Sequence, residues 1–88
     1  MTGSTSCVVL ITGEAIYCAN AGDSRAVIKH GDYAIPLSKD HKPDLPEERG
    51  RIIKAGGEVM DGRVNGMLAL SRAMGDFDYK PITPPKDA

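Results

Sequence analysis

The chain has 88 residues, enough for one domain or for part of one. Its 11 basic and 12 acidic residues are intermixed and leave a formal net charge of −1, which argues against a nucleic-acid partner because such partners require a clustered basic face. The longest apolar run, at residues 7–11, is too short to cross a bilayer and no signal-peptide pattern opens the chain, so we expect no membrane partner and an intracellular protein, cytoplasmic or nuclear.

The first 37 residues predict a β-meander, with turns about every ten residues. Nearly continuous apolar runs in its first two strands indicate burial on both faces, as in an inner layer of a sandwich. Pro36 lacks a backbone donor, which assigns the last strand to an edge or an end position. The polar, glycine-containing start at residues 1–5 is expected to be loose. The predicted strands are residues 6–11, 15–20, 25–30 and 33–37.

The two cysteines, Cys7 and Cys18, are too few for a secreted disulfide framework. If Thr12 and Gly13 form a two-residue hairpin loop, the strand pairing places the cysteines directly opposite each other, close enough to be oxidised. The alternative, which we favour, is a pair of buried, reduced thiols in an intracellular protein.

Residues 44–55 predict one short helix. Asp44 can cap its start, Pro46 is tolerated in the first turn, and Glu47 stands three residues after the cap, as in a capping box. The glycine pair at residues 56–57 supplies the residue type that ends a helix in a left-handed conformation. The helix has few apolar residues, so it could cover one edge or face of a sheet but could not form a core alone.

The remainder of the chain is rich in turn signals. The Asp-Gly dipeptide at residues 61–62 predicts a β-hairpin, and residues 65–66 form a second turn before a short apolar strand at 67–70. Residues 71–80 predict a short helical turn and a loop, and residues 81–88, with three prolines, predict a disordered tail. Because one weak helix cannot cover several apolar strands, the sequence indicates a slice of a larger domain.

No single motif identifies a chemistry from the residues alone. Asp23 stands at a predicted turn between two strands, where a carboxylate could face a metal ion or a phosphate, but spacing alone favours an ordinary hairpin turn. His41 could serve in acid–base or metal chemistry; we favour a loop histidine bonded to backbone. Asp76 and Asp78 could hold a hard cation; we favour a polar loop anchored by Phe77.

Taken in order, several motifs together resemble one known family. They are Gly-Ser-Thr at residues 3–5, Ala-Asn-Ala-Gly-Asp-Ser-Arg at 19–25, Leu-Ser-Lys-Asp-His-Lys-Pro at 37–43, Glu48 with Arg51 and Ile52, Ala-Gly-Gly-Glu-Val at 55–59, and Val-Asn-Gly-Met-Leu-Ala-Leu-Ser-Arg-Ala-Met-Gly-Asp at 64–76. The series resembles the central part of the metal-dependent protein serine/threonine phosphatases of type 2C. The resemblance spans residues 3–80, nearly the whole chain.

The resemblance implies an α+β fold that is part of a four-layer α-β-β-α sandwich, in which two antiparallel sheets pack together between outer helices. It also implies hydrolysis of phosphoserine and phosphothreonine in phosphoprotein substrates. The cofactors would be Mg²⁺ or Mn²⁺, in a two-metal centre that lowers the pKa of a bridging water. Residues 3–80 would then be a partial catalytic domain.

Little of that metal centre can be carried over onto this chain. The family's principal metal-binding Asp-Gly pair and its phosphate-binding Arg precede the segment that resembles Gly3, and two further metal-binding Asp positions follow the segment that resembles Lys80. Only Asp23 resembles a family residue near the metals, where it can contact an additional, weakly held ion. No catalytic or other cofactor-binding residue is assigned, and we expect no tightly bound metal.

We therefore expect the chain, as it stands, to be a catalytically inactive part of a protein phosphatase. The alternative is a non-catalytic pseudophosphatase or protein-interaction module on the same scaffold. In either case, exposed sheet edges are expected to cause self-association of the chain.

Overall fold

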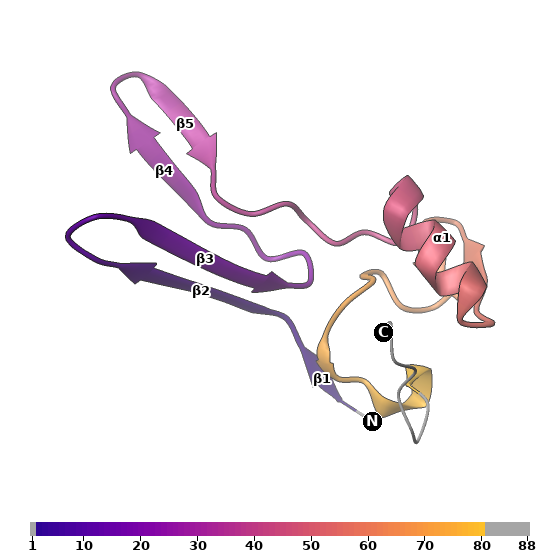
Figure 1. Ribbon diagram of the computed structural model, residues 1–88. Coiled ribbons are helices and arrows are strands. Elements are labelled where there is room, and N and C mark those ends of the chain that lie inside the picture. The colour runs from indigo at the N-terminus through magenta and orange to yellow at the C-terminus, as the bar shows by residue number, and fades with distance from the viewer. Residues whose placement is uncertain (1, 81–88) are drawn as a thin grey trace.

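The computed structural model describes residues 2–80, which form an α+β arrangement with antiparallel sheets (Figure 1). In this range the strands pair two by two, as β1–β8, β2–β3, β4–β5 and β6–β7. The elements are β1 (Gly3–Ser4), β2 (Ser6–Ile11), β3 (Ile16–Ala21), β4 (Val27–His30), β5 (Tyr33–Pro36), α1 (Pro46–Lys54), β6 (Val59–Met60), β7 (Arg63–Val64), β8 (Met74–Gly75) and the 3₁₀ turn η1 (Phe77–Tyr79). The tail predicted at 81–88 lies outside the described residues.

The long strands form two separate hairpins rather than the predicted meander. β2 pairs with β3 and β4 with β5, no described ladder joins β3 to β4, and both hairpins extend away from α1 (Figure 1). Gly22, directly after β3, bonds instead to His41: its N–H donates to Nδ1 at 3.0 Å, and its carbonyl accepts from the His41 N–H at 2.8 Å. Residues 22–24 are therefore a crossing between hairpins and not a hairpin turn.

The register of the first hairpin corrects the expected position of the cysteines. Ile11 pairs with Ile16, so the loop between the strands has four residues rather than two. The hydroxyl of Thr12 stabilises this loop by accepting hydrogen bonds from the backbone N–H groups of Glu14 and Ala15. Cys7 therefore lies opposite Asn20 and not opposite Cys18. Both thiols are free, as favoured, but they are half-buried rather than buried. Burial, together with the neighbouring Cys7 thiol, raises the pKa of the Cys18 thiol.

Helix α1 lies close to the predicted bounds, but no side chain caps its start. Leu45 is the N-cap residue and makes no side-chain bond there, so neither the predicted Asp44 cap nor the capping box with Glu47 forms. The fixed φ of Pro46 favours the first turn instead. The predicted glycine stop is confirmed, since Gly56 has φ +92° and its N–H donates to a carbonyl of the last turn at 3.0 Å. Within residues 2–80, no helix is long and apolar enough to cross a membrane.

Both predicted turn dipeptides of the second half are confirmed. The dipeptide at 61–62 has φ values of +54° and +70°, as a tight hairpin between β6 and β7 requires, and residues 65–66 also have positive φ. The predicted strand at 67–70 is wrong. Within the described chain, this segment makes one isolated β-bridge, in which Leu68 pairs with Val64. The turn at residues 65–66 reverses the backbone directly before the segment, so no second residue pair forms beside this bridge.

The loose start expected at residues 1–5 is also wrong where the structure describes it. β1 pairs with β8, which places Gly3 opposite Gly75 and joins the two ends of the described chain. The sequence did not predict β8, because a two-residue strand is too short to show an alternating pattern. The short helical turn predicted within residues 71–80 is confirmed as η1.

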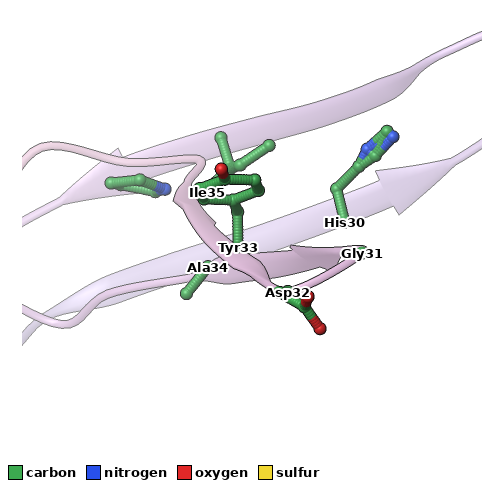
Figure 2. A pocket seen from close by; sticks show the side chains of 7 residues that line it. His30, Gly31, Asp32, Tyr33, Ala34 and Ile35 are labelled. Carbon is green, nitrogen blue, oxygen red and sulfur yellow. The ribbon is translucent and has the colours of Figure 1, made fainter.

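Little apolar surface is buried in the described chain. The buried apolar side chains are those of Ile52 in α1, Val64 in β7 and Pro43 in the loop before the helix. The two long hairpins instead expose their apolar side chains, so the predicted burial on both faces is not achieved within this chain. The exposed residues are Val8, Val9, Leu10, Ile11, Ile16, Tyr17, Val27, Tyr33 and Ile35. Figure 2 shows Tyr33 beside Ile35 in an open hollow lined by residues 30–36.

We expect the 88-residue chain to self-associate at micromolar concentration, because a second copy can cover these apolar faces and pair with the open strand edges. Light scattering should give a mass above that of one chain. Ile11→Lys, at a position that is 73% exposed, should lower the mass. Gly13→Lys adds the same charge in the adjoining loop without removing apolar surface and should not lower it. The mass of one chain at every concentration would contradict the prediction.

Candidate functional site around Asp23

Asp23 lies where the crossing after β3 meets two distant segments of the chain. The preceding residue, Gly22, is buried and has φ +117°. A Cβ atom at this position would stand 2.6 Å from Cγ2 of Thr5 and 3.1 Å from the carbonyl oxygen of Arg72. The hydroxyl oxygens of Thr5 and Ser24 are 2.6 Å apart, so Thr5 also contacts the residue that follows Asp23. The backbone next to Asp23 is therefore tightly enclosed, and glycine is required there.

His41 is a backbone-bonded loop histidine, as the sequence favoured. Its Nδ1 accepts the N–H of Gly22, so the neutral ring carries its proton on Nε2. Its carbonyl accepts the N–H of Ser71 at 3.1 Å. The side-chain amide of Asn20 donates to the carbonyl of Gly22 at 3.3 Å. His41 thus ties the crossing to the segment after β7 and holds backbone in place.

The carboxylate of Asp23 is paired with a lysine. Nζ of Lys42 lies 2.5 Å from Oδ2 of Asp23 and 3.2 Å from the carbonyl oxygen of Ala69. The Asp23 side chain is 27% exposed and that of Lys42 is 42% exposed, so the pair is only partly screened by solvent. Sequence reasoning missed this pair, because the two residues are 19 positions apart and no local spacing rule connects them.

The described residues do not fit a two-metal centre. Nowhere in residues 2–80 do three His, Cys, Asp or Glu side chains gather in a way that could hold a metal ion. Hard cations require several oxygen ligands each. Asp23 supplies one carboxylate, and the Lys42 ammonium already balances its charge.

Of the two carboxylates near the end of the described chain, Asp76 precedes η1 and Asp78 lies within it. The carboxylate of Asp76 lies against Gly3, at the β1–β8 pair. Phe77 does not anchor this segment as expected, since it is 67% exposed. Its ring instead lies 5.8 Å from Nζ of Lys80.

Within residues 2–80, the most deeply buried charge is that of Glu48 in α1, whose side chain is 6% exposed. It accepts hydrogen bonds from Nε of Arg72 at 2.8 Å and from the hydroxyl of Ser71 at 2.7 Å. Arg51, one turn further along the helix, adds a guanidinium contact at 3.4 Å. Burial raises the pKa of Glu48, but the hydrogen bonds from Arg72, Ser71 and Arg51 outweigh it and lower the pKa from 4.5 to about 2.

This cluster of Glu48, Arg51, Ser71 and Arg72 connects the helix to the crossing beside Asp23. Arg51 also donates to the carbonyl of Ser71 at 2.6 Å, and the N–H of Ser71 donates to the carbonyl of His41. The sequence contained one local signal for it, the (i, i+3) pair of Glu48 and Arg51. Its partners Ser71 and Arg72 could not be assigned from spacing.

A second ion pair is more exposed. Nε and Nη2 of Arg25 bind the two carboxylate oxygens of Asp40 at 2.9 and 2.8 Å. The hydrogen bonds lower the pKa of Asp40 and raise that of Arg25. Because the Arg25 side chain is 60% exposed, solvent screens this pair and it contributes less to stability than the Glu48 cluster.

Comparison with solved structures places this arrangement among the phosphatases. A phosphatase from a pathogenic strain of Toxoplasma gondii matches with a TM-score of 0.72 and 52% sequence identity. The match covers 81% of this chain and 23% of that chain. The described residues therefore share the fold of part of that solved phosphatase.

The sequence comparisons then identify the family. The family model described as "Protein phosphatase 2C" matches residues 1–86. Protein phosphatase 2C homolog 2 of Hypocrea jecorina is 59% identical over 80 residues, which are 91% of this chain and 18% of that protein. Probable protein phosphatase 2C 60 of Arabidopsis thaliana is 54% identical over 79 residues, 90% of this chain and 22% of that protein. The chain belongs to the protein phosphatase 2C family and spans about a fifth of the length of these relatives.

Proposed function

We propose that this chain is part of the catalytic domain of a Mg²⁺- or Mn²⁺-dependent protein serine/threonine phosphatase that acts on phosphoproteins in the cytoplasm or nucleus. The observation that carries the proposal is the family match over residues 1–86, together with relatives that are 54–59% identical. The chemistry that the metals supply when bound is a water of lowered pKa that can attack phosphorus.

The residues of this chain would serve that reaction as scaffold. His41 and Ser71 hold the backbone on which Asp23 stands, and the Glu48 cluster fixes α1 against the same segment. Asp23 would contact an additional, weakly held ion. The exposed apolar faces of the two hairpins support a four-layer sandwich, because a second sheet and its outer helices would bury them.

The decisive experiment compares the 88-residue chain with the full-length protein that contains it. Both are assayed for release of inorganic phosphate from phosphoserine and phosphothreonine peptides in the presence of Mn²⁺ or Mg²⁺. We expect release by the full-length protein alone, because the described residues bring together no set of metal ligands. Addition of EDTA should abolish it.

Two other outcomes would change the proposal. Metal-dependent phosphate release by the 88-residue chain itself would show that it is not inactive. Failure of the full-length protein to release phosphate with either metal would contradict the phosphatase function and favour a non-catalytic pseudophosphatase on the same scaffold.

A further inference from the structure

The pair of Asp23 and Lys42 differs from an ordinary surface ion pair. The ammonium of Lys42 has two acceptors from separate segments, the Asp23 carboxylate and the Ala69 carbonyl. The exposed pair of Lys39 and Glu47 makes a useful contrast: its atoms are 3.9 Å apart and its side chains are 72% and 85% exposed.

The backbone on both sides of Lys42 is also fixed. The preceding residue, His41, makes three hydrogen bonds to the backbone of Gly22 and Ser71, through its N–H, its ring and its carbonyl. The following residue, Pro43, is fully buried. The fixed backbone keeps the Lys42 side chain within reach of Asp23, and the second contact with the Ala69 carbonyl also holds the ammonium, so the pair is more persistent than a single contact between two exposed side chains would be.

This geometry leads to an inference that rests on the proposed metal-dependent function. We propose that Lys42 is the resident cation of Asp23, so that a divalent ion can bind this carboxylate only by displacing the Lys42 ammonium. Asp23 and Lys42 together carry no net charge, so the attraction of the site for an incoming cation is reduced. The Ala69 carbonyl remains as an acceptor for the displaced ammonium. Lys42 is thus a positioning residue that sets a low metal affinity at Asp23.

Metal binding to the full-length protein tests this role directly. Mn²⁺ is titrated by isothermal calorimetry into the wild type, Lys42→Met, Asp23→Asn and the double variant. We expect Lys42→Met to strengthen the weakest Mn²⁺ site about tenfold, the effect of one neighbouring charge at a partly exposed position. This gain should disappear in the double variant, because the site then lacks its carboxylate.

Three further variants separate a specific effect from a general one. Lys42→Arg keeps the positive charge and should not strengthen the site. Lys39→Met removes one positive charge from an exposed lysine three positions away and should also leave the affinity unchanged. Lys42→Gln also removes the positive charge but keeps a polar side chain, and it replaces Lys42→Met if that variant does not fold. We expect it to strengthen Mn²⁺ binding to a similar extent.

The proposal is overturned if neutralising Lys42 leaves the Mn²⁺ affinity equal to or below that of the wild type, or if the gain persists without Asp23. The result is independent of the phosphatase assay. A gain that depends on Asp23 in a protein without phosphatase activity would support the role of Lys42 while contradicting the proposed function.

Discussion

Replacing Glu48 with alanine is expected to lower the free energy of unfolding of the full-length protein by about 3 kcal/mol. The side chain is 6% exposed and accepts hydrogen bonds from Ser71, Arg72 and Arg51. Its removal leaves the Ser71 hydroxyl and two guanidinium groups without their carboxylate partner. The expected loss of unfolding free energy is near the lower end of the range for breaking a buried ion pair, because the Arg72 side chain is 45% exposed and can be hydrated again. Urea unfolding followed by circular dichroism measures it.

Glu47→Ala is the matched control for this prediction. Glu47 is the adjacent acidic residue of α1, its side chain is 85% exposed, and its contact with Lys39 is 3.9 Å long. The change has the same chemistry and the same effect on helix charge, but it should cost less than about 0.5 kcal/mol. Equal losses for Glu47→Ala and Glu48→Ala would contradict the role assigned to the buried cluster.

The same carboxylate predicts a dependence of stability on pH. The pKa of Glu48 is lowered to about 2 in the folded protein from an ordinary value of 4.5, so the unfolded chain binds a proton more readily. The contribution of the ionised Glu48 carboxylate to the free energy of unfolding is therefore complete above pH 4.5. It is lost as the pH falls through the folded-state pKa of about 2. Urea midpoints of the wild type and Glu48→Gln should converge over this range.

Replacing Gly22 with alanine is expected to cost about 3 kcal/mol or more of unfolding free energy. Two effects add. The φ of +117° lies in a region that residues with a side chain rarely adopt, and the new Cβ would stand 2.6 Å from Cγ2 of Thr5. The carbonyl oxygen of Arg72, at 3.1 Å, blocks a shift in that direction. The measurement is again the urea midpoint of the full-length protein.

Two other glycines separate crowding from backbone strain. Gly31, in the turn between β4 and β5, also has a positive φ, +62°, but nothing lies within 4 Å of its would-be Cβ. Gly31→Ala should therefore cost only about 1 kcal/mol. Gly13 has neither a positive φ nor a neighbour within 4 Å, so Gly13→Ala should be nearly neutral. A Gly22→Ala variant no less stable than Gly31→Ala would show that the crossing beside Asp23 is not enclosed.

The sequence predicted those elements whose signals are local. The apolar run bounded by a turn gave β2 its predicted bounds, Ser6–Ile11, and the glycines after α1 gave the helix its end. The turn at residues 61–62 was equally clear, because few residues other than Asp, Asn and Gly adopt positive φ. β8 and the absence of a strand at 67–70 could not be predicted, because both depend on which distant segment supplies the backbone partner.

For the candidate site, the sequence by itself determined the family, through motifs in a fixed order, and the resemblance to that family gave the prediction that Asp23 lies near a metal ion. The tertiary structure decided what Asp23 contacts. Its partner Lys42 is 19 positions away, and Ser71 and Arg72, two of the three partners of Glu48, are 23 and 24 positions away. Such pairs depend on how the chain crosses itself at Gly22 and His41. A local sequence pattern can place a charge in a turn, but only the packed backbone determines which opposite charge meets it.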